Sequence, residues 1–431
     1  MLVGNQLFGL VPESKKDVVE LTDLVLAETR IPPETSRKIF KTRTMKGAVR
    51  RSIDAVSRWV EEHQYKAYDP GDGNTSFLRL LTFKNMFLER ALTAAVLRAP
   101  FNIRPWIGIT PHTSTKGMGY MAWGYILMWA QTGDKRFRDR AVACLDWLME
   151  NRAAGWAQYC WGNHFAFVTR NGRLPALEPT IVWSSLIGLA FLKAYEVLGD
   201  AKYLEVASSV SDWILTLPRE QTDSGACLSY VPHTQSSIHN SNLLGAGLLA
   251  SVSKHTHDPK AREVARDAMI YSCTRQLPDG AWYYGEAPKN RWFDNFHTGY
   301  NLDSLQRYIE ATGDRTFEDT LRRGVDYFKT NFFEADGRPK YFFNQTYPID
   351  IQCASQAIDT LTLFSSSDRE SFRLACKVAE WTIVNMQDAD GHFYYRDLGW
   401  KKVRTPMLHW GQGTMFKALA HLSARLENGE A

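Results

Sequence analysis

The sequence predicts an all-α protein folded as an (α/α)6 toroid, a ring of six helical hairpins with short aromatic β-hairpins at its rim. One observation is a repeat. An acidic residue followed by glycine and then aromatic residues recurs at Asp223, Asp279, Asp336 and Asp390, at intervals of 56, 57 and 54 residues. Intervals this regular indicate a repeated supersecondary unit rather than unrelated turns.

A second pattern marks the turn inside each hairpin. It consists of two-residue turns ending in aspartate: Gly133-Asp134, Gly199-Asp200, His257-Asp258, Gly313-Asp314 and Ser367-Asp368. Glycine suits the C-terminal end of one helix, and aspartate caps the start of the next. Between these marks apolar residues recur at helical spacing, so each unit is expected to be a helix, a short turn, a second helix and a hairpin.

The third observation is a helix near the start of the sequence that can complete the ring. Six helices that precede such turns are expected to begin near Lys116, Thr180, Asn240, His297, Gln352 and His409. Five of them have a partner downstream, and the helix expected over residues 50–62 supplies the sixth. We therefore expect one domain over residues 45–428 and an arm, residues 1–44, packed outside it or partly mobile. An open helical solenoid is the alternative.

Composition limits the classes of function. The chain has 431 residues, of which 44% are apolar and 23% charged, as in globular proteins. Its 51 basic and 47 acidic residues are mixed along the sequence, so nucleic acid is not expected as a partner. The N-terminus lacks a signal-peptide pattern, and no stretch approaches the ~18 apolar residues of a membrane span. Six scattered cysteines fit reduced, structural thiols, and we expect a cytoplasmic protein.

The toroid predicts where chemistry takes place. Its inner helices all run the same way, so their N-termini converge on one mouth, and each N-terminus favours a nearby anion by roughly 0.3–1 kcal/mol. The segments at these starts combine tryptophans with amides and carboxylates. Aromatic faces that stack on sugar rings, beside polar groups that orient hydroxyls, are typical of a carbohydrate site.

Four residues are candidates for catalysis. His297 can titrate near neutral pH and begins an inner helix, with Asp294 and Tyr300 three residues away on either side. His297 could instead only cap the helix, and Asp294 could be the N-cap. Glu286 could take part in acid–base chemistry or form a solvated ion pair with Arg291.

The candidates for substrate binding lie at the same inner-helix starts and in the loops before them. They are Arg104, Lys116, Trp161, His164, Trp183, Asn240, Asn242, Tyr284, Arg291, Trp292, Asn295, Asp350, Gln352 and His409. We expect no metal and no cofactor. Asp350, Cys353 and His409 could be imagined as zinc ligands but lack a tight CxxC or HxxxH spacing, and GxSxG, P-loop and GxGxxG motifs are missing from the sequence.

Several segments in combination resemble the polysaccharide-biosynthesis VpsJ family of bacteria. They are Tyr68-Asp69-Pro70 with Gly73, Asn102-Ile103-Arg104-Pro105, Cys160-Trp161-Gly162, Asp294 to Leu302 and Tyr347 to Ile351. This resemblance implies a pathway of exopolysaccharide or capsule synthesis. Gln352 stands where the family pattern has histidine. The segments 276–282 and 387–393 are similar to turns of terpene-cyclase toroids, although a DxDD motif is missing from the sequence.

These observations lead to a functional hypothesis. The protein is expected to act on an anionic glycan, which could be lipid-linked or nucleotide-linked, by removing the C5 proton of a uronic acid. His297 or Tyr300 would remove the proton, and Arg104, Lys116 or Arg291 would neutralise the carboxylate. Reprotonation would make the protein an epimerase, and elimination a lyase. The alternatives are a glycoside hydrolase using Glu286 with Asp294 or Asp350, and a non-catalytic glycan-binding or assembly protein.

Overall fold

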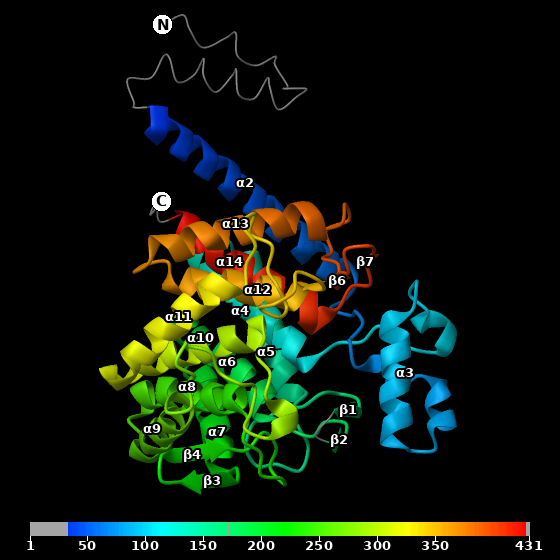
Figure 1. Cartoon of the computed structure of the whole chain (residues 1–431), viewed down its shortest axis with the longest axis vertical. Helices are drawn as coiled ribbons and strands as arrows, with labels where there is room; N and C mark the ends of the chain where they lie inside the picture. The colour runs from blue at the N-terminus through cyan, green and yellow to red at the C-terminus, as the bar shows by residue number, and fades with distance from the viewer. Residues whose placement is uncertain (1–32, 170–171, 428–431) are drawn as a thin grey trace, which may run out of the picture.

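Twelve helices of the computed structural model, which describes residues 33–169 and 172–427, form two concentric layers (Figure 1). The inner layer contains α4 (Thr115–Thr132), α6 (Ile181–Leu198), α8 (His239–Thr256), α10 (Asn295–Thr312), α12 (Ile351–Phe364) and α14 (Gly413–Glu427). The outer layer contains α2 (Pro33–Glu62), α5 (Lys135–Glu150), α7 (Ala201–Thr216), α9 (Pro259–Cys273), α11 (Glu318–Asn331) and α13 (Arg369–Met386). The predicted (α/α)6 toroid is confirmed.

The helices begin and end at the predicted two-residue turns. Gly133, Gly199 and Gly313 end inner helices in the left-handed conformation, and Asp134 and Asp200 each accept a hydrogen bond from a backbone N–H at the start of the next helix. All six inner helices begin within a few residues of the expected positions. The last one is preceded by a π-helical turn over Leu408–Gln412.

Ring closure depends on the first described helix. α2 packs against α13 and α14, and Ser52 Oγ donates a hydrogen bond to Gln387 Oε1 at 2.7 Å. On the inside, Phe416 of α14 packs against Gly124 of α4, where an added Cβ would lie 2.4 Å from the phenyl ring. The ring is therefore continuous. α2 begins at Pro33, well before the expected Arg50, while residues 1–32 lie outside the described residues, so the expected boundary between arm and toroid stays a prediction.

The repeated acidic-glycine turns bind neighbouring hairpins together. Gly225, Gly280, Gly337 and Gly391 all have positive φ angles. A Cβ on Gly280 would lie 2.3 Å from the carbonyl oxygen of Arg323 in α11, and one on Gly391 would lie 2.5 Å from that of Ala55 in α2. Each turn thus packs on the backbone of an outer helix, which only glycine permits.

The inner helices are buried on nearly every side, because they face both the outer layer and each other. α6 shows this best, since every residue from Ile181 to Leu192 is buried. By length and mean hydropathy of 1.5, α6 could cross a membrane, which corrects the expectation that no stretch approaches that length. In this structure 72% of its residues are buried inside the ring.

Short strands lie at the rim. β1 (Phe167–Thr169) pairs with β2 (Gly172–Leu174), and β3 (Arg219–Thr222) with β4 (Gly225–Leu228), both antiparallel. β5 (Ile349–Asp350), β6 (Arg396–Asp397) and β7 (Lys402–Val403) form an antiparallel sheet in that order. The β6–β7 loop lies on the same side of the ring as β1, β2 and an additional helix, α3 (Met86–Arg98) (Figure 1).

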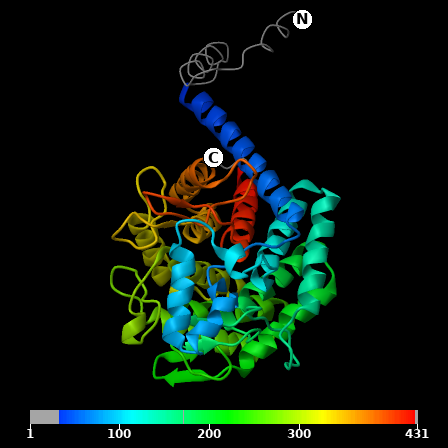
Figure 2. The same ribbon diagram turned by 90° about the vertical axis from the view of Figure 1, so that its right-hand side faces the viewer.

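α3 belongs to an excursion between the first outer and first inner helix. Short 3-10 turns flank it, over Phe77–Thr82 and Arg104–Ile107. Figure 2 shows α3 in front of the ring, on the face that carries these rim strands. The sequence analysis did not predict this element.

Candidate active site

His297 is held by the aspartate that caps its own helix. Asp294 Oδ1 accepts the backbone N–H of His297 at 2.9 Å, and Asp294 Oδ2 lies 2.8 Å from His297 Nδ1. Because a carboxylate only accepts hydrogen bonds, Nδ1 carries a proton, and Nε2 of the neutral ring is the acceptor. Asp294 is fully buried, whereas the His297 side chain is 18% exposed. Asp294 therefore caps the helix and orients His297 at the same time, and its catalytic role stays a prediction.

Aromatic side chains surround this histidine. Its ring centroid lies 4.7 Å from that of Tyr284, 5.6 Å from that of Trp292 and 6.5 Å from that of Tyr300. Tyr284 and Trp292 are stacked on each other at 4.4 Å. Among the sequence candidates, these residues are brought together as predicted, and they form one wall of the mouth.

A second histidine also lies beside a carboxylate, at ion-pair distance rather than in a hydrogen bond. His409, in the π-helical turn before α14, places Nδ1 3.0 Å from Asp69 Oδ2 and 3.1 Å from Ser114 Oγ. Burial raises the pKa of Asp69, but His409, the backbone N–H of Gly71 and His112 together outweigh it and hold that pKa at about 2. In the described chain neither His409 Nε2 nor His297 Nε2 has a hydrogen-bond partner. The starts of two inner helices thus each place a histidine beside a carboxylate, hydrogen-bonded at His297 and in ion-pair contact at His409.

Lys116 lies between aromatic rings near both histidines. Its Nζ is 4.9 Å from the ring centroid of Trp183 and 5.8 Å from those of Tyr120 and Tyr300, while Trp183 packs 5.4 Å from His409. No ion pair or hydrogen bond of Nζ is found among the described residues. Burial lowers the pKa of Lys116 to about 8. A desolvated ammonium without a carboxylate bound to it is a site for an anionic group.

The floor of the mouth is a hydrogen-bonded polar layer. The hydroxyls of Tyr120 and Tyr300 lie 2.8 Å apart, and Gln352 Nε2 donates to the Tyr300 hydroxyl at 2.8 Å. Burial raises the pKa of Tyr300 well above 10, so its hydroxyl stays protonated at neutral pH. This favours Tyr300 as a hydrogen-bond donor over Tyr300 as a base.

Several buried polar atoms at the inner-helix starts lack a hydrogen-bond partner within the described chain. They are Trp183 Nε1, Asn163 Oδ1, Asn240 Oδ1, both amide atoms of Asn295, Trp292 Nε1 and Gln352 Oε1. Buried polar atoms are almost always paired, and an unpaired one costs ~1–3 kcal/mol. These atoms can therefore form hydrogen bonds with water or with a polar ligand at the starts of the inner helices.

The remaining candidate carboxylates, Glu286 and Asp350, already form hydrogen bonds or ion pairs within the protein. His239 Nε2 lies 2.7 Å from Glu286 Oε1, and the pKa of Glu286 is lowered by this bond. Arg291 donates to the backbone oxygen of Glu286, which corrects the expected Glu286–Arg291 ion pair. Asp350 accepts from Trp410 Nε1 at 2.9 Å and pairs with Arg396 at 2.5 Å. These contacts suit positioning roles rather than a carboxylate pair facing a glycosidic oxygen.

Other candidates for substrate binding lie in the walls of the mouth and already form bonds within the protein. The Arg104 side chain is buried and forms a salt bridge with Asp72 at 2.8 Å, so its charge is already neutralised. Trp161 is fully buried and donates Nε1 to the Leu148 oxygen, and the Asn242 amide bonds to backbone and Ser272. Their burial and bonding correct the expectation that Trp161 and Asn242 contact substrate.

His164 is half-buried beside a histidine that the sequence analysis did not consider. Its ring centroid lies 4.1 Å from that of His112, and burial lowers the pKa of His164 to about 3. His164 is therefore neutral at physiological pH. Both of its ring nitrogens lack a hydrogen-bond partner among the described residues, so it can act as a donor or an acceptor for a ligand.

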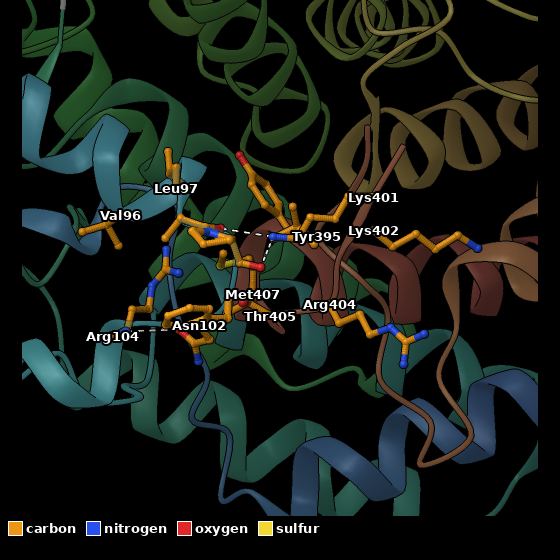
Figure 3. Close-up of a pocket in the computed structure, with 14 residues that line it drawn as sticks. Val96, Leu97, Asn102, Arg104, Tyr395, Lys401, Lys402, Arg404, Thr405 and Met407 are labelled. Atoms are coloured by element: carbon orange, nitrogen blue, oxygen red, sulfur yellow. Dashed lines mark hydrogen bonds between the residues drawn. The ribbon is translucent and has the colours of Figure 1, made fainter. Parts of the chain in front are cut away.

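A cavity of about 380 Å³ adjoins this site at the rim (Figure 3). It lies between the end of α3, with Leu97 and Arg104, and the β6–β7 segment, with Tyr395, Lys401 and Met407. Met407 directly precedes the turn that carries His409. In Figure 3 Lys401 points across the cavity toward the end of α3, where its Nζ donates to the Ala99 oxygen at 3.3 Å. The sequence analysis did not find this cavity.

A buried polar cluster lies further along the inner helices. Asp359 pairs with Lys417 and lies 2.9 Å from His421 Nδ1, while Asp303 is held by Gln356 at 2.8 Å. Burial raises the pKa of Asp303 to about 7. The sequence carries a signal that could have predicted this cluster. Each carboxylate is a charged residue on a buried inner helix, and it follows another polar residue of that helix by three or four positions.

Solved structures with the same fold include several proteins named for sugars. A cellobiose 2-epimerase from Spirochaeta thermophila matches with a TM-score of 0.56 at 14% identity, covering 82% of this chain and 99% of its own. A GH76 α-mannanase from Bacteroides thetaiotaomicron matches with a TM-score of 0.58 at 11% identity, covering 74% and 88%. An unsaturated glucuronyl hydrolase specific for heparin matches with a TM-score of 0.58 at 12% identity, covering 89% and 98%.

Sequence comparison adds no closer relationship. No protein-family model and no curated protein matches the chain. The structural matches establish the fold, and the resemblance to the VpsJ family stays an expectation.

Proposed function

We propose that this protein is a carbohydrate-active enzyme that moves a proton on the C5 carbon of a uronic acid, as an epimerase or a lyase. The single observation that carries the proposal is the pair His297–Asp294 and His409–Asp69, near the buried ammonium of Lys116. Removing a proton beside a carboxylate needs a base, a group that stabilises the negative charge, and a proton source.

Each part of the site has a role in this reaction. One histidine removes the C5 proton through Nε2, and Lys116 pairs with the substrate carboxylate, on which negative charge accumulates. The hydroxyl of Tyr300 donates a hydrogen bond to the same group. The other histidine returns a proton from the opposite face, which gives the C5 epimer. Loss of the C4 substituent instead of reprotonation gives an unsaturated sugar.

The proposal also covers the class of substrate and the pathway in which the reaction takes place. The structural relatives include proteins named as a sugar epimerase, a mannose isomerase and a glucuronyl hydrolase, which supports a sugar as substrate. The resemblance to the VpsJ family supports a pathway of exopolysaccharide or capsule synthesis in the cytoplasm. The unpaired Lys116 favours an acidic sugar over a neutral one.

The test is exchange of the C5 proton with solvent. Polysaccharides containing uronic acids are incubated with the protein in heavy water and followed by proton NMR, with the His297→Ala and His409→Ala variants in parallel. We expect deuterium at C5 with the intact protein and a loss of at least ~100-fold in either variant. New reducing ends without deuterium would support a glycoside hydrolase. Binding without any reaction would support a glycan-binding protein.

A further inference from the structure

The excursion in front of the ring carries most of the exposed large apolar side chains of the described chain. Here "the excursion" means residues 76–106. Nine of fourteen such side chains belong to it: Phe77, Leu80, Leu81, Phe83, Met86, Phe87, Leu88, Phe101 and Trp106. Leu80 is 82% exposed and Phe83 83% exposed. Clusters of this kind on a soluble domain mark a surface for a protein or a membrane.

The excursion is nevertheless a folded element with an inner face. Glu89 of α3 is 1% exposed and receives Arg79 at 3.0 Å and Arg173, from β2, at 2.6 Å. Ser76 Oγ donates to the Ile107 oxygen at 2.7 Å, joining the two ends of the segment. The exposed apolar residues are therefore the outer face of an anchored structure.

The charge of this outer face has one sign. Between Asp72 and Asp134 the sole acidic residue of the sequence is Glu89, which is buried and paired. Lys84, Arg90 and Arg98 are exposed beside the apolar side chains. The excursion thus presents apolar and cationic groups with no exposed carboxylate of its own.

The backbone around Phe83 turns apolar and cationic side chains of the excursion outward. Phe83 and the next residue, Lys84, both adopt the left-handed conformation, with φ angles of 50° and 58°. Two consecutive residues other than glycine in this region are unfavourable, and such strain is found where function requires it. The strained turn presents a phenyl ring and an ammonium side by side.

We propose that the excursion docks the protein on a lipid bilayer that contains anionic headgroups. Phe, Leu and Trp side chains entering the boundary between headgroups and acyl chains, with Lys and Arg at the headgroups, are the pattern of interfacial helices. Trp400, 80% exposed in the β6–β7 loop, adds a ring beside the end of α3. A second copy fits less well, because a two-fold interface would bring two cationic faces together with no exposed carboxylate of the excursion to pair with Lys84, Arg90 and Arg98.

Docking in this way has a geometric consequence. α3 lies on the face of the ring that carries the rim strands and the turn before α14 (Figure 2). A bilayer bound to the excursion would therefore face the mouth of the toroid.

The test is sedimentation of the full-length protein with vesicles of phosphatidylcholine, with and without phosphatidylglycerol. We expect binding to the anionic vesicles that weakens as salt is raised. The double variant Phe83→Glu/Phe87→Glu should lower the partition coefficient at least ~10-fold. The matched control is Val384→Glu, because Val384 is 74% exposed on α13, away from the excursion, and this variant should bind as the intact protein does.

Other outcomes overturn the proposal. One is sedimentation with neither type of vesicle, and another is equal loss of binding in both variants. A third is a dimer in solution that the double variant converts to monomers while vesicles are not bound, which would assign the face to a second copy. Circular dichroism melting of each variant checks that loss of binding does not come from unfolding.

Discussion

Replacing Lys116 with methionine is expected to stabilise the fold while removing the site for an anion. Burial lowers the pKa of Lys116 from 10.5 to about 8, so the charged form disfavours folding at pH 7. A difference of ~2.5 pKa units at ~1.36 kcal/mol each gives about 3 kcal/mol. Methionine keeps most of the buried methylene groups but loses the contact of the ammonium with Trp183, which offsets ~0.5–2 kcal/mol. The net stabilisation is about 1–3 kcal/mol.

The sign of the pH dependence distinguishes this cause from better packing. Between pH 8 and 10.5 the folded protein releases the Lys116 proton while the unfolded chain keeps it, so the intact protein gains stability as pH rises through this window. The advantage of Lys116→Met should shrink by ~2–3 kcal/mol between pH 7 and pH 10.

Urea unfolding of both proteins at pH 7 and pH 10, followed by circular dichroism, measures these differences. The reasoning would be refuted if Lys116→Met were no more stable than the intact protein at pH 7, or if its advantage were the same at both pH values. In the deuterium-exchange assay the same variant should be inactive on uronic acids, so one substitution separates stability from function.

Two further predictions follow from the packing and the second histidine. Gly391→Ala should destabilise the fold by ~2–4 kcal/mol, because its Cβ would lie 2.5 Å from the Ala55 oxygen, whereas Gly199→Ala, with nothing within 4 Å, should cost only ~1 kcal/mol; thermal unfolding compares them. Asp69→Asn should keep the fold but remove the negative charge that faces His409, so the exchange rate should fall, and an unchanged rate would argue against the His409–Asp69 pair.

The ring could be predicted from sequence because its determinants are local and repeated. Each capping aspartate and each glycine with positive φ acts on its immediate neighbours, and the period then counts the hairpins. The His297–Asp294 pair was predictable for the same reason, since a helix N-cap and the third helical residue always lie close together.

The contacts that complete the site could not be predicted from local sequence patterns. Asp69 and His409 lie 3.0 Å apart at opposite ends of the chain, and no spacing encodes such a contact. The excursion was missed because its apolar residues do not follow the period of the ring. Arg104 was expected to neutralise a substrate carboxylate, because no sequence pattern shows that it pairs with Asp72, 32 residues away in the chain.

Closure of the ring by α2 has a consequence for how the protein is made. The apolar face of α2, with Val49, Ile53 and Val56, packs against α14, which comes last in sequence order among the twelve ring helices. At ~5–20 residues per second, the ribosome adds the intervening chain in roughly 20–70 s. During this interval α2 can already pair with α4 and α5, through Ser57 with Tyr125 and Glu61 with Arg140, but its face toward α14 stays exposed. This face of α2 is therefore open to aggregation until α14 has been synthesised.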